Sequence, residues 1–141
     1  MKFQHRPILL IEDNPMDEDL TRRAFARRKV VNPIEVARDG EQALDYLSRW
    51  REGSPLPVVI LLDINLPKIN GLEVLRQYKA SPYAQRVPVI ILTTSAEDRD
   101  IQIAYELGAN SYIVKPVDFE KFLEVAAQID LYWNMINMPP R

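Results

Sequence analysis

The chain has 141 residues, of which 47% are hydrophobic, and its 18 basic and 20 acidic residues give a formal net charge of −2. This length predicts one domain with a conventional core, and the near-neutral charge argues against a general nucleic-acid or membrane-surface binder. The absence of cysteine excludes disulfides and thiolate chemistry. With no apolar stretch near the roughly 20 residues of a membrane span and no signal-peptide core, we expect a cytoplasmic protein.

Short apolar runs alternate with helical patterns along the whole chain. We expect strands near residues 7–12, 33–38, 58–63, 88–93 and 111–114. We expect helices near residues 15–29, 40–50, 71–80, 97–107 and 118–134. Five alternations of strand and helix predict an α/β fold, with a doubly wound parallel sheet and right-handed crossovers.

Several helix ends can be predicted from single residues. Asn14 as a cap, followed by Pro15 at the first helical position, begins the first helix. Ser95 with Asp98 resembles a capping box that opens the fourth helix, and Gly108 ends that helix as a left-handed cap.

The first predicted helix has acids in its first turn and bases in its last turn, which complements the helix dipole. The acids are Asp17, Glu18 and Asp19, and the bases are Arg22, Arg23, Arg27, Arg28 and Lys29. We interpret both groups as helix-stabilising rather than as a binding patch.

The last predicted helix carries more apolar surface than one core face needs. One face of this helix is expected to point inward, and its apolar residues at helical spacing are Phe119, Phe122, Leu123, Ala126, Ile129 and Trp133. Further apolar residues lie outside that face, namely Val125, Tyr132 and Ile136, and Met135 and Met138 are close to them in the sequence. We therefore expect a subunit contact through this helix and the tail, residues 134–141.

Side chains with useful chemistry follow four of the predicted strands. They are Glu12 and Asp13 after residues 8–11, Asp63 after 58–62, Thr93 after 89–92 and Lys115 after 112–114. Ligand chemistry in open α/β sheets gathers outside the carboxyl ends of the strands, so we expect one site here.

Three of these side chains predict a metal site. Glu12, Asp13 and Asp63 would crowd three negative charges, which a hard divalent cation relieves. Oxygen ligands suit Mg²⁺, and backbone groups just after Asp63, including the Asn65 carbonyl, would complete its shell.

The same group of residues suits phosphoryl transfer. A carboxylate such as Asp63 can accept a phosphoryl group as an acyl phosphate. Lys115 would neutralise a phosphoryl oxygen, and the Thr93 hydroxyl would hydrogen-bond the product. Each of these residues on its own has a simpler explanation, as part of a helix cap, a turn or a strand end. Chance is a poor explanation for such residues at the ends of four strands together.

Over nearly its whole length the chain resembles the receiver domains of bacterial two-component response regulators. The resemblance is carried by Ile11-Glu12-Asp13-Asn14, Leu61-Leu62-Asp63-Ile64-Asn65-Leu66-Pro67, Gly71, Leu92-Thr93-Thr94-Ser95 and Val114-Lys115-Pro116. It implies a flavodoxin-like sheet with strand order 2-1-3-4-5.

The resemblance also implies a role for each site residue. Asp63 is then the phosphoacceptor, Glu12 and Asp13 hold Mg²⁺, and the Asn65 backbone assists. Thr93 is the switch hydroxyl, Lys115 contacts the phosphoryl group, and Tyr112 is the aromatic residue that moves inward on phosphorylation. The peptide bond between Lys115 and Pro116 is then cis. The fourth helix, last strand and last helix form the responding surface.

Two positions depart from the family pattern. Glu12 replaces an aspartate that is often found there, and its longer reach still permits metal contact. Thr94 is larger than the small residue common after the switch hydroxyl, so it is expected to narrow access to the acyl phosphate. We therefore predict slow phosphoryl loss from Asp63.

A closer resemblance is to the single-domain regulators that work with bacterial phytochromes and related sensor histidine kinases. It rests on Asn14-Pro15-Met16-Asp17, Leu107-Gly108-Ala109-Asn110-Ser111-Tyr112, Lys115-Pro116-Val117-Asp118 and Tyr132-Trp133. The resemblance implies a receiver domain over residues 1–133 without an output module, a sensor histidine kinase as partner and a homodimer.

Two other functions fit part of the pattern. A receiver-like scaffold would keep the fold without phosphorylation. An aspartate-nucleophile phosphatase would also use a carboxylate at a strand end with Mg²⁺, but those enzymes resemble one another in a second aspartate where this chain has Asn65. We therefore expect a signalling protein rather than an enzyme.

Overall fold

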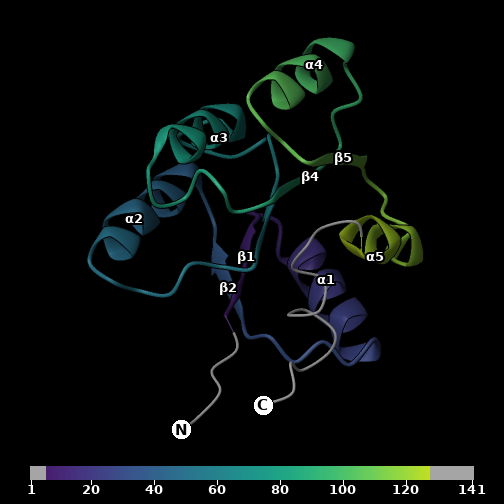
Figure 1. Ribbon diagram of the computed structural model, residues 1–141. Coiled ribbons are helices and arrows are strands. Elements are labelled where there is room, and N and C mark those ends of the chain that lie inside the picture. The colour runs from purple at the N-terminus through teal and green to yellow at the C-terminus, as the bar shows by residue number, and fades with distance from the viewer. Residues whose placement is uncertain (1–5, 128–141) are drawn as a thin grey trace, which may run out of the picture.

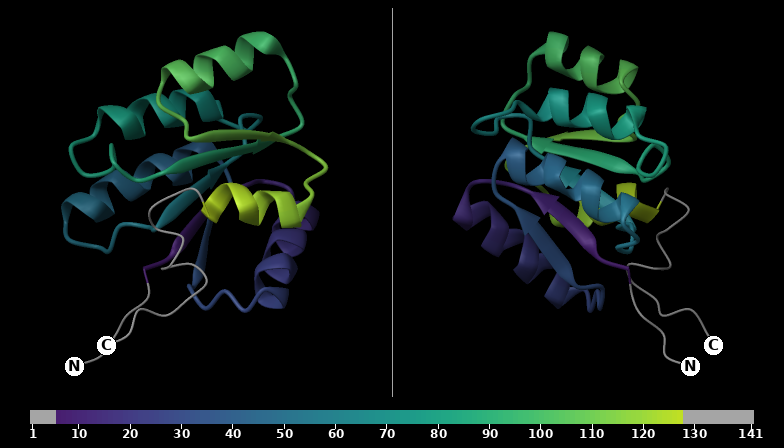
Figure 2. Two further views of the ribbon diagram at one scale, coloured as in Figure 1. Left: turned by 45° about the vertical axis from the view of Figure 1, so that its right-hand side comes forward. Right: turned by 90° about the vertical axis from the view of Figure 1, so that its left-hand side faces the viewer.

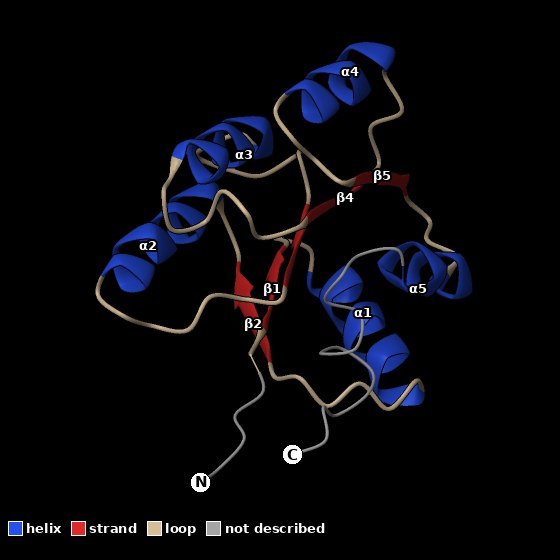
Figure 3. Cartoon of the chain, in the orientation of Figure 1, coloured by secondary structure: helices blue, strands red, loops and turns tan. Residues whose placement is uncertain are grey.

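A computed structural model describes residues 6–127, which form a five-stranded parallel sheet between two layers of helices (Figure 1). The strands are β1 (Ile8–Ile11), β2 (Ile34–Ala37), β3 (Val59–Leu62), β4 (Val89–Thr93) and β5 (Ser111–Val114). The helices are α1 (Pro15–Arg27), α2 (Gly40–Arg51), α3 (Gly71–Ala80), α4 (Asp98–Glu106) and α5 (Phe119–Ala127). The strand order is β2-β1-β3-β4-β5, as predicted (Figure 3).

The apolar runs become the centre of the sheet. Every residue of β1, β3 and β4 is buried, because helices cover both faces of these strands. The edge strands β2 and β5 are partly exposed.

Alternate residues of each central strand serve two cores. Leu9 and Ile11 face the layer of α2, α3 and α4, where Tyr78 is completely buried. Ile8 and Leu10 face the layer of α1 and α5, which contributes Phe25 and other buried side chains. Figure 2 shows these two layers on opposite sides of the sheet.

The predicted start of α1 and end of α4 are confirmed. Asn14 Oδ1 accepts hydrogen bonds from the backbone N–H groups of Met16 at 2.8 Å and Asp17 at 3.3 Å. Gly108, which directly follows the C-cap residue Leu107, has a φ of 108°. Both ends are therefore set by local chemistry.

The predicted capping box at the start of α4 is wrong. The residue before the helix is Glu97, whose side chain makes no capping hydrogen bond. The Ser95 hydroxyl instead donates to Asp100 Oδ2 at 2.6 Å, and Asp98 is the first helical residue. The helix begins too late for Ser95 to act as its cap.

Gly71 brings α3 unusually close to the end of β3. Its N–H donates to the Ile64 carbonyl at 2.8 Å, and a Cβ at this position would lie 2.3 Å from the Asp63 carbonyl oxygen. Asp63 and Ile64, which directly follow β3, are thus packed against the first residue of α3.

The last described helix joins the core through part of its predicted inward face. Phe122 and Leu123 are buried, and the Phe122 ring lies 5.5 Å from the Phe25 ring between centroids. The predicted extension to residue 134, with Ile129, Trp133 and the tail 134–141, lies outside the described residues. None of the helices within residues 6–127 combines the length and apolar character that crossing a membrane requires.

Candidate functional site

Main-chain hydrogen bonds bring the four predicted strand ends to one edge of the sheet. The Asp63 N–H donates to the Ile11 carbonyl at 3.1 Å, which places Asp63 beside the end of β1. The Lys115 N–H donates to the Thr93 carbonyl at 2.8 Å, which joins the ends of β4 and β5 in the same way. The predicted clustering of these residues is therefore observed.

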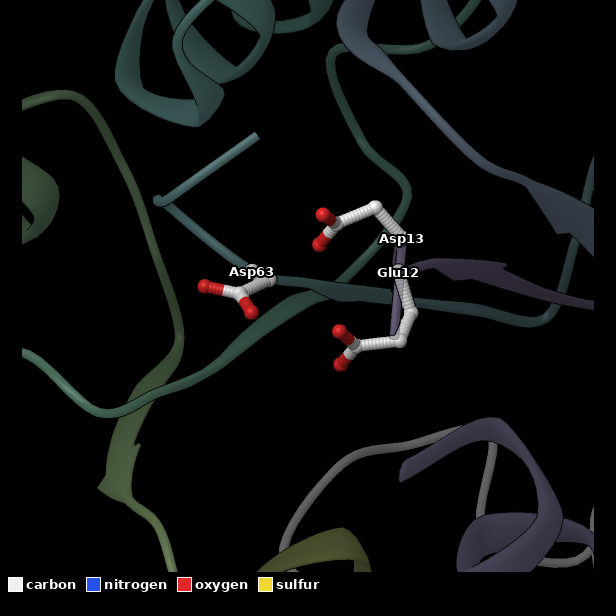
Figure 4. Close-up of side chains that lie close together, drawn as sticks. All are labelled: Glu12, Asp13 and Asp63. Atoms are coloured by element: carbon white, nitrogen blue, oxygen red, sulfur yellow. The ribbon is translucent and has the colours of Figure 1, made fainter. Parts of the chain in front are cut away.

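The three predicted metal ligands form a carboxylate cluster. One oxygen from each of Glu12, Asp13 and Asp63 lies within 4.8 Å of the others, and Figure 4 shows the three side chains together. Glu12 and Asp63 are buried, whereas Asp13 is exposed. A set of oxygen donors only, open to solvent on one side, fits a hard cation such as Mg²⁺ that keeps several waters.

Lys115 connects the cluster to α1. Its ammonium nitrogen lies 2.7 Å from Glu12 Oε1, 2.8 Å from Asp17 Oδ2 and 3.1 Å from Asp63 Oδ2. All three ammonium hydrogens therefore have carboxylate acceptors. Burial alone would lower the pKa of Lys115, but the contacts with Asp17, Glu12 and Asp63 outweigh it and raise that pKa. Lys115 is a firmly charged group.

The pKa of Glu12 is raised by burial. Burial raises its pKa from 4.5 to about 7, even though the hydrogen bond from Lys115 acts in the opposite direction, and the charge of Asp63 adds to the rise. The Asn14 N–H also donates to Glu12 Oε2, at 3.2 Å. A cation that shares the cluster would favour the ionised form of this side chain.

Asn65 contacts both the Asp63 carboxylate and the Thr93 hydroxyl. Its backbone N–H donates to Asp63 Oδ1 at 2.9 Å and so orients that carboxylate. Its side-chain Nδ2 lies 3.4 Å from the hydroxyl oxygens of both Thr93 and Thr94. Thr93 is completely buried, so its hydroxyl faces the interior of this edge rather than solvent.

Tyr112 lies farther along the same edge, and its ring packs against the core on the α2, α3 and α4 side. Its hydroxyl donates to the Ser95 carbonyl at 2.9 Å and so ties β5 to the loop after β4. Lys115 and Pro116 are joined by a cis peptide bond, as the sequence resemblance implied.

Asp17 belongs to this site, although its place in the sequence predicted a helix-dipole role and no contact with the other site residues. Helical side chains tilt toward the amino end of their helix, and α1 begins directly after the end of β1. An acid in the first turn of α1 is therefore directed back toward Glu12. The tilt of helical side chains toward the amino end is the signal from which the position of Asp17 could have been predicted.

The parallel sheet with strand order 2-1-3-4-5 defines a flavodoxin-like domain. Its carboxyl edge, where such domains bind ligands, carries an acidic cluster, a buried hydroxyl and a lysine. Residues 8–127 match the family described as response regulator receiver domain, and the chain belongs to that family. Receiver domains of this family are the partners of sensor histidine kinases in two-component signalling.

The similarity to individual relatives extends over most of both chains. The probable methanogenesis regulatory protein FilR2 of Methanothrix harundinacea is 45% identical over 135 residues, which are 94% of this chain and 86% of that protein. The bacteriophytochrome response regulator RtBRR has a TM-score of 0.81 at 47% identity, over 96% of this chain and 84% of that one. The Mn²⁺-bound form of response regulator Rcp1, from Synechocystis, has a TM-score of 0.76 at 34% identity, over 96% and 99%. The chain is thus a receiver domain similar to response regulators of phytochrome systems.

Proposed function

We propose that Asp63 accepts a phosphoryl group from the phosphohistidine of a sensor histidine kinase. An Asp63 oxygen attacks phosphorus, the bond from phosphorus to the histidine nitrogen breaks, and an acyl phosphate forms. The observation that supports this most strongly is the setting of the carboxylate. Asp63 is buried at the end of a central strand, with Oδ1 held by the Asn65 N–H and Oδ2 by Lys115. A carboxylate that is held in place beside a charged lysine side chain suits a nucleophile in phosphoryl transfer.

We infer that Glu12, Asp13, Asp63 and the Asn65 backbone carbonyl hold Mg²⁺. When bound, the ion neutralises charge on the phosphoryl oxygens. The proposal is supported by the oxygen-only cluster and by the Mn²⁺ in the similar protein Rcp1.

The remaining residues have separate tasks in this proposal. Lys115 donates to a phosphoryl oxygen, and the Thr93 hydroxyl donates to the acyl phosphate once it forms. Tyr112, which is tied to the loop after Thr93, passes the change to the face formed by α4, β5 and α5. The physical signal is an added charge with strong acceptor oxygens.

A direct test is to incubate the protein with acetyl phosphate and Mg²⁺ and to measure its intact mass. We expect one phosphoryl adduct per chain, lost in Asp63→Asn and kept in Asp19→Asn, an exposed acid of α1 that pairs with Arg23. A wild-type chain without an adduct would support the scaffold instead. Multiple turnover of small phosphate esters would support the phosphatase.

We also infer that the partner kinase is a bacterial phytochrome and that the chain works in the cytoplasm as a homodimer. The similarity to RtBRR and Rcp1 supports the kinase, and the apolar surplus of the last predicted helix supports the dimer. Sedimentation should show a dimer that weakens when residues 132–141 are removed. A monomer in both forms would contradict the subunit contact.

A further inference from the structure

Lys115 has one acidic partner that lies outside the proposed cation cluster. Glu12 and Asp63 contact Lys115 and also belong to the set of carboxylates that could share a cation. Asp17 contacts Lys115 at 2.8 Å but is not a member of that set. The lysine is therefore shared between two kinds of carboxylate.

The position of Asp17 is fixed by the start of α1. Asn14 caps the helix and accepts a hydrogen bond from the Asp17 N–H, while Pro15 is the first helical residue. The Thr21 hydroxyl donates to the Asp17 carbonyl at 2.9 Å, which holds the next turn. With 31% of its side chain exposed, against 11% for Lys115, Asp17 approaches the lysine from the solvent side of the site.

Lys115 and a divalent cation compete for the carboxylates of Glu12 and Asp63. The contact oxygens of Lys115 on Glu12 and Asp63 are carboxylate oxygens of the cluster, and a second positive charge there repels the ammonium group. We expect Lys115 to loosen its hold on both carboxylates when they bind a cation, because of that repulsion. A lysine with no other partner would then be free to swing into solvent.

We propose that Asp17 is a positioning residue that holds Lys115 at the sheet edge while Glu12 and Asp63 bind the cation. One ammonium hydrogen stays on Asp17, and the two that are released become available to a phosphoryl oxygen. The role in phosphoryl transfer rests on the function proposed above, whereas the exchange of partners does not depend on it.

The exchange can be tested by Mg²⁺ binding alone, with a double-mutant cycle on the full chain. Calorimetry would give the Mg²⁺ dissociation constant for wild type, Asp17→Asn, Lys115→Met and the double variant. We expect Asp17→Asn to raise the constant about fivefold when Lys115 is present, the size expected for the loss of one partly exposed hydrogen bond between charged groups. In the Lys115→Met background the same change should have less than about half that effect. Without the contact to Lys115, Asp17 acts on Mg²⁺ only through the long-range attraction of its charge.

Matched variants separate positioning from simple charge. Asp19→Asn removes the same charge from the same helix, at a residue that pairs with Arg23, and should leave Mg²⁺ binding within about 1.5-fold of wild type. Asp17→Glu keeps the charge and should restore most of the affinity. Equal losses from Asp17→Asn with and without Lys115 would overturn the proposal, as would a wild-type chain that binds no Mg²⁺.

Phosphorylation by acetyl phosphate at saturating Mg²⁺ is the second measurement. Asp17→Asn should slow adduct formation about fivefold, because Lys115 is no longer held near Asp63, while Asp19→Asn should not change the rate. If wild type forms no adduct, the proposed function fails while the Mg²⁺ cycle still decides the role of Asp17. If wild type forms the adduct but the two variants react alike, only the inference about Asp17 fails.

Discussion

Replacing Gly71 with alanine tests whether the contact between α3 and β3 fixes Asp63. A glycine-to-alanine change at an ordinary helical position stabilises a protein by about 0.5–1 kcal/mol, because glycine loses more freedom on folding. At this position an alanine Cβ would lie 2.3 Å from the Asp63 carbonyl oxygen and 2.7 Å from the Ile64 Cα. Both neighbours are backbone atoms, so the start of α3 or the end of β3 must move.

The expected cost can be estimated from this overlap. Inserting a methyl group into a closely packed place costs about 1–3 kcal/mol, which outweighs the gain in helix propensity and leaves a net loss of about 1–2 kcal/mol. For 141 residues the entropy of unfolding near the melting temperature is about 0.3 kcal/mol per kelvin. Gly71→Ala should therefore lower Tm by about 3–7 °C.

Calorimetric melting and acetyl phosphate labelling, run on the same samples, would measure both consequences. Because Asp63 belongs to the displaced backbone, we expect slower phosphorylation at temperatures where the variant is still folded. Gly53→Ala is the control, since Gly53 has a φ of 108° with nothing within 4 Å of an added Cβ. That change should cost stability through backbone strain but leave the phosphorylation rate unchanged. A Gly71→Ala variant with wild-type Tm and rate would refute the reasoning.

Further predictions concern the lifetime of the acyl phosphate, the dependence on pH and the packing of α5. Thr94→Ala should shorten the acyl phosphate lifetime about two- to fivefold, because it widens access to the acyl phosphate and removes a weak hydrogen bond from Asn65; an unchanged lifetime would contradict the role of Thr94 in limiting access. Because burial raises the pKa of Glu12 to about 7, Mg²⁺ affinity by calorimetry should rise up to about tenfold per pH unit below pH 7 and then level off, with a flat profile in Glu12→Gln. The same shift makes the ion-free fold lose stability as pH rises from about 4.5 to 7, since the folded state holds the proton more tightly. Phe122→Ala should lower the free energy of unfolding by about 3–5 kcal/mol in denaturant titrations; a loss below 1 kcal/mol would mean that α5 does not pack as described.

The sheet was predictable because its signal is local. Runs such as Val58 to Leu62 are typical of strands buried on both faces, and the structure buries all of these residues. The start of α4 was not predictable in this way. Ser95, Glu97 and Asp98 are all residues found at helix starts, and the bond from Ser95 to Asp100 depends on where the loop after β4 ends. A short pattern cannot decide between such neighbouring alternatives.

The site was predictable in its members but not in its contacts. Because parallel strands end at the same edge, Glu12, Asp63 and Lys115 had to lie near one another. That Lys115 reaches Asp17, 98 positions earlier in the chain, depends on the tilt of one side chain in α1. The link from the Asn65 side chain to two hydroxyls depends likewise on the loop after β3. Strand ends predict which residues meet, whereas hydrogen-bond partners require side-chain geometry.

The charges at this edge suit an exchange of partners better than a fixed arrangement. Among the described residues, the Lys115 ammonium group contacts three carboxylates, Asp13 adds a fourth acid to the cluster, and burial disfavours the ionised form of Glu12. An added cation lowers the cost of that excess negative charge, and an added phosphoryl group then gives the cation and Lys115 a new acceptor. Lys115 directly follows β5, three residues after Tyr112, so we expect each change in its partners to act on the strand that carries the proposed switch residue.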